Sequence, residues 1–169
     1  MIDKFIKRFV SSPLLVYTLR CLIGFLVGFS LYNSYPQFEL FWTLLSIILV
    51  ISPEEKDSRR LSIERFKSNL IGSSVAMACL FVHESNIYNI IIGIILTIIV
   101  CRLFHVMNMA RVAVVALLII MVQPHHTAMN ITPIFRFLSV GLGCIVGLLI
   151  VVFTSIIFRY FKRKYGIKY

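Results

Sequence analysis

The sequence predicts an all-α integral membrane protein in which six transmembrane helices form two inverted three-helix repeats. Two observations lead to this fold class. The 169-residue chain is 59% hydrophobic, with a mean hydropathy of +0.93, and is thus more apolar than a soluble domain of this size. The chain also repeats itself without a gap: Pro53, Arg65, Phe66, Ser68 and Gly72 recur 71 residues later as Pro124, Arg136, Phe137, Ser139 and Gly143.

Hydropathy divides the chain into six apolar spans that are expected to be transmembrane helices. They cover residues 13–32, 39–53, 68–83, 87–104, 110–123 and 134–158. A crossing needs about 20 residues, which suits the first, fourth and sixth spans. The second and fifth spans are shorter, and each ends at one of the repeated prolines. Residues 54–67, between the second and third spans, are expected to form a charged, helix-like segment.

The repeat predicts how the two halves of the chain are oriented. Three spans separate each residue from its copy, and because this number is odd, the copy must have the opposite direction in the membrane. Such inverted-topology repeats are typical of many transporters. Repeat 1 covers about residues 13–83 and repeat 2 about residues 84–154. Both belong to a single transmembrane domain, residues 1–169, with a basic tail at 159–169.

The basic residues orient the six spans. Fifteen of the 17 Lys and Arg residues fall on one side: Lys4, Lys7, Arg8, Lys56, Arg59, Arg60, Arg65, Lys67, Arg102, Arg111, Arg159, Lys162, Arg163, Lys164 and Lys168. The positive-inside rule then predicts a multi-pass protein of the cell (inner) membrane with both termini in the cytoplasm. Charges placed between spans argue against a nucleic acid partner, despite the net charge of +10. A cleaved signal peptide is disfavoured because Arg20 interrupts the first span.

Arg20 and Arg136 lie outside this cytoplasmic set. An arginine in hydrocarbon is costly and marks a protein interior or a water-filled path. The alternatives are that Arg20 extends to the cytoplasmic surface and that Arg136 contacts lipid phosphate at the interface. Because Arg65 and Arg136 are copies in inverted repeats, we expect one guanidinium near each mouth of a shared passage. There each guanidinium is able to bind a carboxylate through two parallel hydrogen bonds.

Residues next to the repeated arginines and at the ends of the short spans are further candidates for lining a path. Phe66 and Phe137 provide aromatic walls, or else pack against lipid. Ser52 with Pro53, and Gln123 with Pro124, end the short spans. Short helices at matching places in two repeats indicate a transporter's binding site. The alternative is that each proline only terminates a helix.

Other kinds of site find little support in the sequence. It contains no phosphate-binding loop, Ser-His-Asp pattern, haem motif or intramembrane acid pair, so we expect neither an enzyme nor a cofactor. His83, Glu84, His125 and His126 share the outer side, but their spacing is not that of a metal site. The four cysteines are interpreted as small core residues. Small-xxx-small patterns beginning at Gly24, Gly72 and Gly143 indicate tight helix packing, with dimerisation as one use.

The chain resembles a known family over almost its whole length. Residues 41–53, FWTLLSIILVISP, resemble the tryptophan-containing second helix of the fusaric acid resistance (FUSC) and aromatic acid exporter families. In those families a basic loop follows, and then a helix start with the pattern Arg-x-x-[Gly/Ser]-[Thr/Asn]-x-x-Gly, which here reads RFKSNLIG at residues 65–72. Residues 111–123 and the helix around Arg136 are similar to the second half of the same six-helix unit, to which plant malate channels are distantly related.

The resemblance implies transport, but the chain departs from many relatives in one respect. Those relatives carry two six-helix units or large cytoplasmic domains, whereas this chain has a single unit. If a pore needs two units, a homodimer is implied. We therefore expect a transporter or channel for small organic anions, aromatic carboxylates among them, embedded in the lipid bilayer. The alternative is an accessory or structural membrane protein without transport activity, which the small size and the lack of a coupling carboxylate favour.

Overall fold

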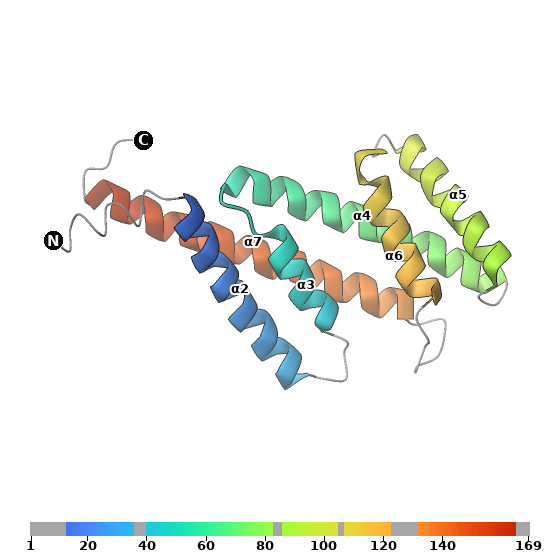
Figure 1. Cartoon of the computed structure of the whole chain (residues 1–169), viewed down its shortest axis with the longest axis horizontal. Coiled ribbons are helices and arrows are strands. Elements are labelled where there is room, and N and C mark those ends of the chain that lie inside the picture. The colour runs from blue at the N-terminus through green and yellow to red at the C-terminus, as the bar shows by residue number, and fades with distance from the viewer. Residues whose placement is uncertain (1–12, 36–39, 83–85, 105–106, 123–131, 165–169) are drawn as a thin grey trace. The chain divides into compact units, whose positions relative to one another are not determined.

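The computed structural model describes residues 13–35, 40–82, 86–104, 107–122 and 132–164, and the regular structure in this part of the chain is helical. The elements are α2 (Pro13–Ser34), α3 (Phe41–Val50), α4 (Glu55–Val82), α5 (Ile87–Leu103), the short 3-10 helix η2 (Met107–Met109), α6 (Ala110–Val122) and α7 (Thr132–Lys164) (Figure 1). The prediction of an all-α fold is confirmed.

Helix α4 joins two segments that hydropathy separates. The charged residues 54–67 and the third apolar span form one helix of 28 residues that begins at Glu55. Glu55 and Asp57 lie in its first turn, where carboxylates interact favourably with the positive end of the helix dipole. Because neither proline nor glycine occurs between Glu55 and Ile71, nothing in the sequence breaks the helix at the change from polar to apolar residues.

The chain folds into two compact units. Unit 1 contains residues 1–62 and 142–169, and unit 2 contains residues 63–141. The boundary falls within α4 and within α7, so each of these two helices contributes residues to both units.

Unit 1 is built around α3. Helix α2 packs against α3, and Ile47 and Ile51 are buried together with Val151 of α7. Gly143 allows α7 to approach α3 closely, because a Cβ atom at this position would lie 2.5 Å from the Thr43 carbonyl oxygen. The short helix is therefore held on one side by α2 and on the other by α7.

Unit 2 has a comparable core around α6. Helix α5 packs against α6, and six side chains of α4 and α6 form the buried centre: Val75, Ala76, Cys79, Leu117, Ile120 and Met121. Gly72 of α4 lies directly against the Ala113 backbone carbonyl and the Ala116 side chain. Gly72 and Gly143, which are copies in the repeat, thus both permit a close helix–helix contact.

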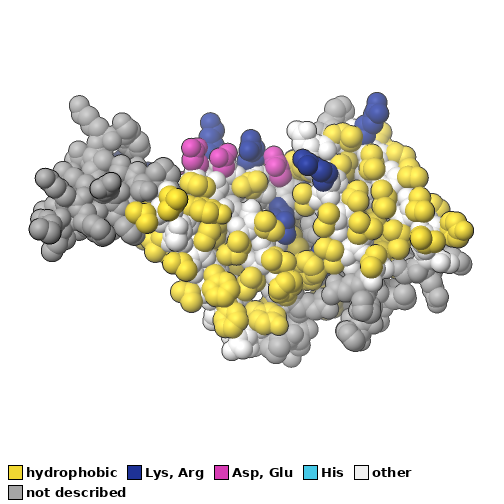
Figure 2. Space-filling view, viewed as in Figure 1, with side chains coloured by type: hydrophobic (Ala, Val, Ile, Leu, Met, Phe, Trp, Pro, Cys, Tyr) yellow, Lys and Arg dark blue, Asp and Glu magenta, His cyan; other side chains and the backbone are white. Residues whose placement is uncertain are grey.

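Much of the surface is apolar. Hydrophobic side chains cover most of the visible described surface in Figure 2. On α5, Ile87, Ile91, Ile95 and Ile98 form an exposed stripe along one side of the helix. Such a surface is unsuited to water and suits lipid or another helix. Two segments, Leu14–Ser34 and Pro133–Tyr160, are long and apolar enough to cross a membrane, and three further apolar helices are shorter.

Candidate functional site

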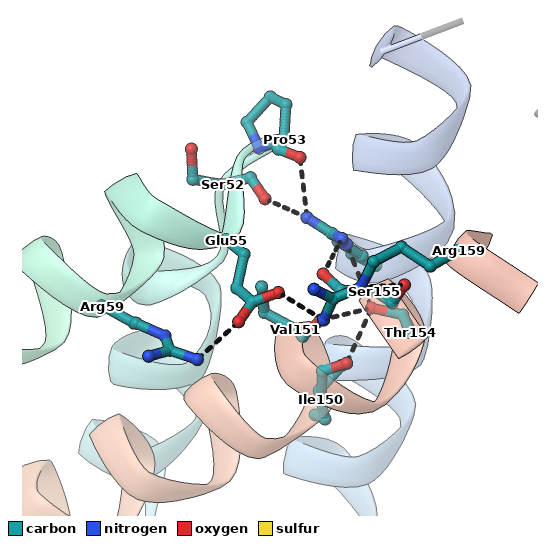
Figure 3. Close-up of polar contacts among 10 residues, drawn as sticks. Ser52, Pro53, Glu55, Arg59, Ile150, Val151, Thr154, Ser155 and Arg159 are labelled. Atoms are coloured by element: carbon teal, nitrogen blue, oxygen red, sulfur yellow. Dashed lines mark hydrogen bonds and ion pairs between the residues drawn. The ribbon is translucent and has the colours of Figure 1, made fainter. Parts of the chain in front are cut away.

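Arg20 of α2 is the centre of a buried polar cluster in unit 1. Its partners Ser52, Pro53, Thr154 and Ser155 are labelled in Figure 3. The side chain is only 3% exposed. Its Nη1 atom donates hydrogen bonds to the carbonyl oxygens of Ser52 and Pro53, both at 2.8 Å. Its Nε donates to Thr154 Oγ1 at 3.0 Å, and its Nη2 to Ser155 Oγ at 2.7 Å. The guanidinium thereby connects α2, the α3–α4 junction and α7.

These contacts explain how an irregular backbone is accommodated between α3 and α4. Helix α3 ends at Val50, and the N–H of Ile51 closes its last turn on the Ile47 carbonyl at 3.2 Å. The next two carbonyls, of Ser52 and Pro53, belong to no helix. Backbone carbonyls away from water need a donor, and Arg20 supplies it for both.

The α7 side of the cluster consists of two adjacent hydroxyls. Thr154 donates its own proton to the carbonyl of Ile150 at 2.8 Å or of Val151 at 3.0 Å. This back-bonding within the helix leaves oxygen lone pairs of Thr154 for Arg20. Since hydroxyl oxygens accept as well as donate, the pair suits a guanidinium in an otherwise apolar helix.

Glu55, at the start of α4, is the acidic partner of this region. Its carboxylate accepts from Arg59 Nη2 at 2.6 Å and from Arg159 Nη2 at 3.0 Å. Burial alone would raise the pKa of the Glu55 carboxyl. The hydrogen bonds from Arg59 and Ser155 and the charges of Arg159 and Arg59 outweigh burial and hold this pKa below its usual value. Glu55 therefore stays ionised and ties the N-terminus of α4 to α7.

The second cluster lies in unit 2, around the repeated Arg-Phe pairs. Arg136 of α7 is 6% exposed, whereas its copy Arg65 on α4 is half-buried. The rings of Phe66 and Phe137 are in contact, with centroids 5.1 Å apart and an interplanar angle of 53°. Each phenylalanine therefore packs against its own copy in the repeat.

A small pocket opens beside Phe137. Its volume is about 100 Å³, and its walls come from α4 (Leu70, Ser73, Ser74 and Met77) and α7 (Pro133, Ile134 and Phe137). Ser73 is 5% exposed, and Asn69, one turn earlier on α4, is 4% exposed. Within the described part of the chain, the Ser73 Oγ and Asn69 Nδ2 atoms have no hydrogen-bond partner.

The residues predicted from sequence thus fall into three groups. Ser52 and Pro53 lie with Arg20 in unit 1, and Arg65, Arg136, Phe66 and Phe137 all belong to unit 2. Gln123 and Pro124 lie outside the described residues, as do His83, Glu84, His125 and His126. Among the residues that the structure describes, no group of three or more His, Cys, Asp or Glu is arranged to hold a metal ion.

Several members of both clusters were not predicted from the sequence. Thr154 and Ser155 are the only polar residues between Gly143 and Phe158. Two hydroxyls in an otherwise apolar stretch could have indicated a buried polar contact. Glu55 and Arg159 gave no comparable signal, because each belongs to a run of charged residues. Asn69 did carry a signal, because it occupies the [Thr/Asn] position of the family pattern at residues 65–72. Ser73 could not be distinguished from the other polar residues of α4.

The fold, the exposed apolar surface and the buried arginines define an all-helical membrane protein. A family model described as fusaric acid resistance protein-like matches residues 19–150, which is most of the chain. The chain therefore belongs to this family, as the resemblance of residues 41–53 and 65–72 had suggested. No curated protein and no solved structure matches it. Membership of this family indicates a role in membrane transport or efflux.

Proposed function

We propose that the protein is a transporter or channel for small organic anions, aromatic carboxylates among them, in the cell (inner) membrane. The observation that carries the proposal is Arg136, an arginine that is only 6% exposed and lies in a helix apolar enough to cross a membrane. Helix α7 contains no Asp or Glu. A buried cation in such a helix marks a functional site in membrane proteins, and an anion is its natural counter-charge.

The inverted repeat forms part of the proposal. Adding 71 to the bounds of α2, α3 and α4 gives ranges that overlap α5, α6 and α7 respectively. The packing within the units agrees with this relation, since α2 packs on α3 in unit 1 and α5 packs on α6 in unit 2. Residues 13–83 and 84–154 are then related by a rotation of about 180° around an axis in the membrane plane.

The positions of corresponding residues on α4 and α7 support such an axis. Ser62 Oγ donates to the Cys144 carbonyl oxygen at 3.3 Å in unit 1. The copies of these residues, Pro133 and Ser73, line the same pocket in unit 2. A two-fold axis places a residue beside its own copy only where both lie close to the axis. The contact between the rings of Phe66 and Phe137 therefore supports an axis that passes near these two residues.

Within this proposal the arginines have different roles. Arg65 and Arg136, one from each repeat, bind the anion, with Phe66 and Phe137 as the aromatic walls of the passage. Because the two phenylalanine rings touch, this arrangement replaces the expectation of one guanidinium at each mouth. Arg20 contributes to the path indirectly, because its donors are already bonded to protein and it fixes the carbonyls of Ser52 and Pro53. Gln123 and Pro124 are the proposed counterparts of that segment at the other end of the path.

Transport in proteoliposomes tests the proposal. Vesicles that contain the full chain are expected to take up radiolabelled benzoate faster than protein-free vesicles. Arg136→Gln and Arg65→Gln each remove a charged hydrogen-bond donor, so we expect uptake to fall about tenfold or more. Arg111→Gln, at an exposed arginine of unit 2, is the matched control and is expected to leave uptake unchanged.

The competing proposal is an accessory membrane protein that transports nothing. One observation favours it: every nitrogen of the Arg20 guanidinium is bonded to a protein acceptor, as in a structural cluster. Wild-type vesicles that take up neither benzoate nor other small carboxylates would favour this second function. Unchanged uptake in both the Arg65 and Arg136 variants would show that these residues do not line an anion path.

Assembly is the last part of the proposal. A single six-helix unit of this size offers little room for a passage of its own, so we propose a homodimer. Both copies have the same orientation in the membrane, and the two-fold axis of the dimer therefore lies along the membrane normal. Crosslinking in membranes at native expression is expected to give a dimer, and a result with monomer alone would contradict this part.

A further inference from the structure

Two buried hydrogen-bond donors of α4 are left without acceptors in the described part of the chain. They are Asn69 Nδ2 and Ser73 Oγ, on residues that are 4% and 5% exposed. Both are on α4 with a spacing of four residues, so they are neighbours on one side of the helix. Buried donors are nearly always paired, and one that stays unpaired destabilises the fold.

Ser73 differs in this respect from other buried hydroxyls of the protein. Ser46, Thr97 and Thr154 each donate to the carbonyl four residues earlier, at 2.7–2.8 Å. That bond is the usual way for a helix to satisfy a hydroxyl inside a membrane protein. In Ser73 the hydroxyl makes no such bond, and Ser73 is one of the residues that line the pocket beside Phe137. The group is therefore available to a molecule in the pocket.

The pocket limits the size and polarity of that molecule. Apart from Ser73 and Ser74, its walls are the apolar side chains of α4 and α7, with Phe137 and Met77 among them. A volume of about 100 Å³ is smaller than the ~150 Å³ cavity that accommodates benzene. Because the pocket is not fully enclosed, it has room for a short alkyl chain or for part of a single ring.

The charges of unit 2 determine which kind of acceptor fits. Residues 63–141 contain five basic residues (Arg65, Lys67, Arg102, Arg111 and Arg136) but only two acidic ones (Glu64 and Glu84). The electrostatic potential of this unit therefore favours an anion. A carboxylate only accepts hydrogen bonds and has two oxygens to offer, which matches two adjacent donors.

We propose that Asn69 and Ser73 bind the carboxylate of a small organic anion whose apolar body occupies the pocket beside Phe137. The inference rests on the proposed transport function and names the residues that select its substrate. In the absence of the anion the two donors remain unpaired, and their desolvation is offset when the carboxylate arrives. Substrate affinity is thus gained at some loss of stability in the empty protein.

Two variants test this site. In Ser73→Ala and Asn69→Leu the donors are replaced by apolar groups, and the full chain is assayed for radiolabelled benzoate uptake in proteoliposomes and for Tm in detergent micelles. We expect the KM for benzoate to rise about tenfold in each, since each loses a hydrogen bond to a charged group. We expect the Tm to stay unchanged or to rise, because an unpaired buried donor has been removed.

Ser46→Ala is the matched control, because Ser46 is a buried serine whose hydroxyl is already bonded to the Trp42 carbonyl. It is expected to lower the Tm and to leave the KM unchanged. Wild-type KM values in both the Ser73 and Asn69 variants would overturn the site and leave the transport function standing. A fall in their Tm like that of Ser46→Ala would overturn the site as well. It would mean that the two donors are already hydrogen-bonded in the empty protein, to water, to lipid or to another protein group. Failure of the wild type to take up benzoate, propionate or malate would overturn both proposals.

Discussion

Phe66 and Phe137 are 71 residues apart in the sequence, at identical positions of the repeat, and their rings are in contact with centroids 5.1 Å apart. The phenylalanines come from α4 and α7, each directly after a repeated arginine. Around this pair unit 2 also contains the pocket and the two unpaired donors of α4. The features that we associate with the substrate therefore all belong to the unit in which Phe66 contacts its copy Phe137.

The ring contact is expected to show energetic coupling. In a double-mutant cycle of Phe66→Ala and Phe137→Ala, the coupling free energy of unfolding should be about 0.5–1.5 kcal/mol, the usual value for an aromatic pair. Reversible unfolding in mixed micelles gives this quantity. Phe66→Leu keeps an apolar side chain without the ring and is expected to retain only part of the coupling. Strictly additive effects of the two alanine variants would show that the pair does not interact.

Arg20 is expected to be indispensable for stability. Arg20→Met removes the donors for the Ser52 and Pro53 carbonyls and leaves these groups unpaired, at a cost of about 3–5 kcal/mol in the free energy of unfolding. Arg20→Lys is expected to rescue little, because an ammonium group cannot reproduce the planar arrangement of donors. Thermal unfolding in micelles provides the measurement. Arg102→Met, at an exposed arginine, serves as the control, and an equal loss of stability there would refute the proposed role.

Removal of one hydroxyl tests the α7 side of the Arg20 cluster. Thr154→Val deletes the acceptor of Arg20 Nε with little change of shape, so we expect a loss of about 1–3 kcal/mol. Because both substitutions affect the same guanidinium, the effects of Thr154→Val and Arg20→Met should be less than additive. Full additivity in unfolding measurements would mean that the two residues act separately.

Glu55 is expected to make stability depend on acidic pH. Its pKa is lowered in the folded protein relative to the ordinary value of 4.5. The corresponding stability is therefore complete above about pH 4.5 and is lost as the pH falls below that value and through the lowered pKa. Glu55→Gln should be less stable than the wild type at neutral pH and equal to it in strong acid. The exposed neighbour in Glu54→Gln serves as control, and a gap between Glu55→Gln and wild type that does not change with pH would exclude the ionic origin.

Cysteine labelling tests the predicted orientation in the membrane. In a variant without Cys21, Cys79, Cys101 and Cys144, single cysteines at positions 57 and 163 should react only from the cytoplasmic side. Cysteines at positions 35, 85 and 127 should react only from the outside. Labelling of position 127 from the cytoplasm would contradict both the six-span count and the inverted repeat.

The helices of this protein could be read from its sequence because hydropathy is a local property. Five of the six predicted spans correspond to single helices in the described part of the chain. The third differs, since the charged residues before it continue into the same helix. Polarity changes there without a helix breaker, so the hydropathy boundary is not a boundary of secondary structure. The family followed from short motifs in the same way, and the match over residues 19–150 confirms it.

The sequence by itself determined the helical class, the 71-residue repeat and the distinction of Arg20 and Arg136, both of which are buried, from the other basic residues, because each depends on residue type and spacing along the chain. Only the tertiary structure decided what those arginines contact. The partners of Arg20 lie 32 to 135 residues away, and no local pattern links Ser52 to Thr154. Ser46 and Ser73 are equally able to bond within their helices, yet only Ser73 leaves its hydroxyl unpaired. The environment of each hydroxyl is created by helices that approach it from distant parts of the chain.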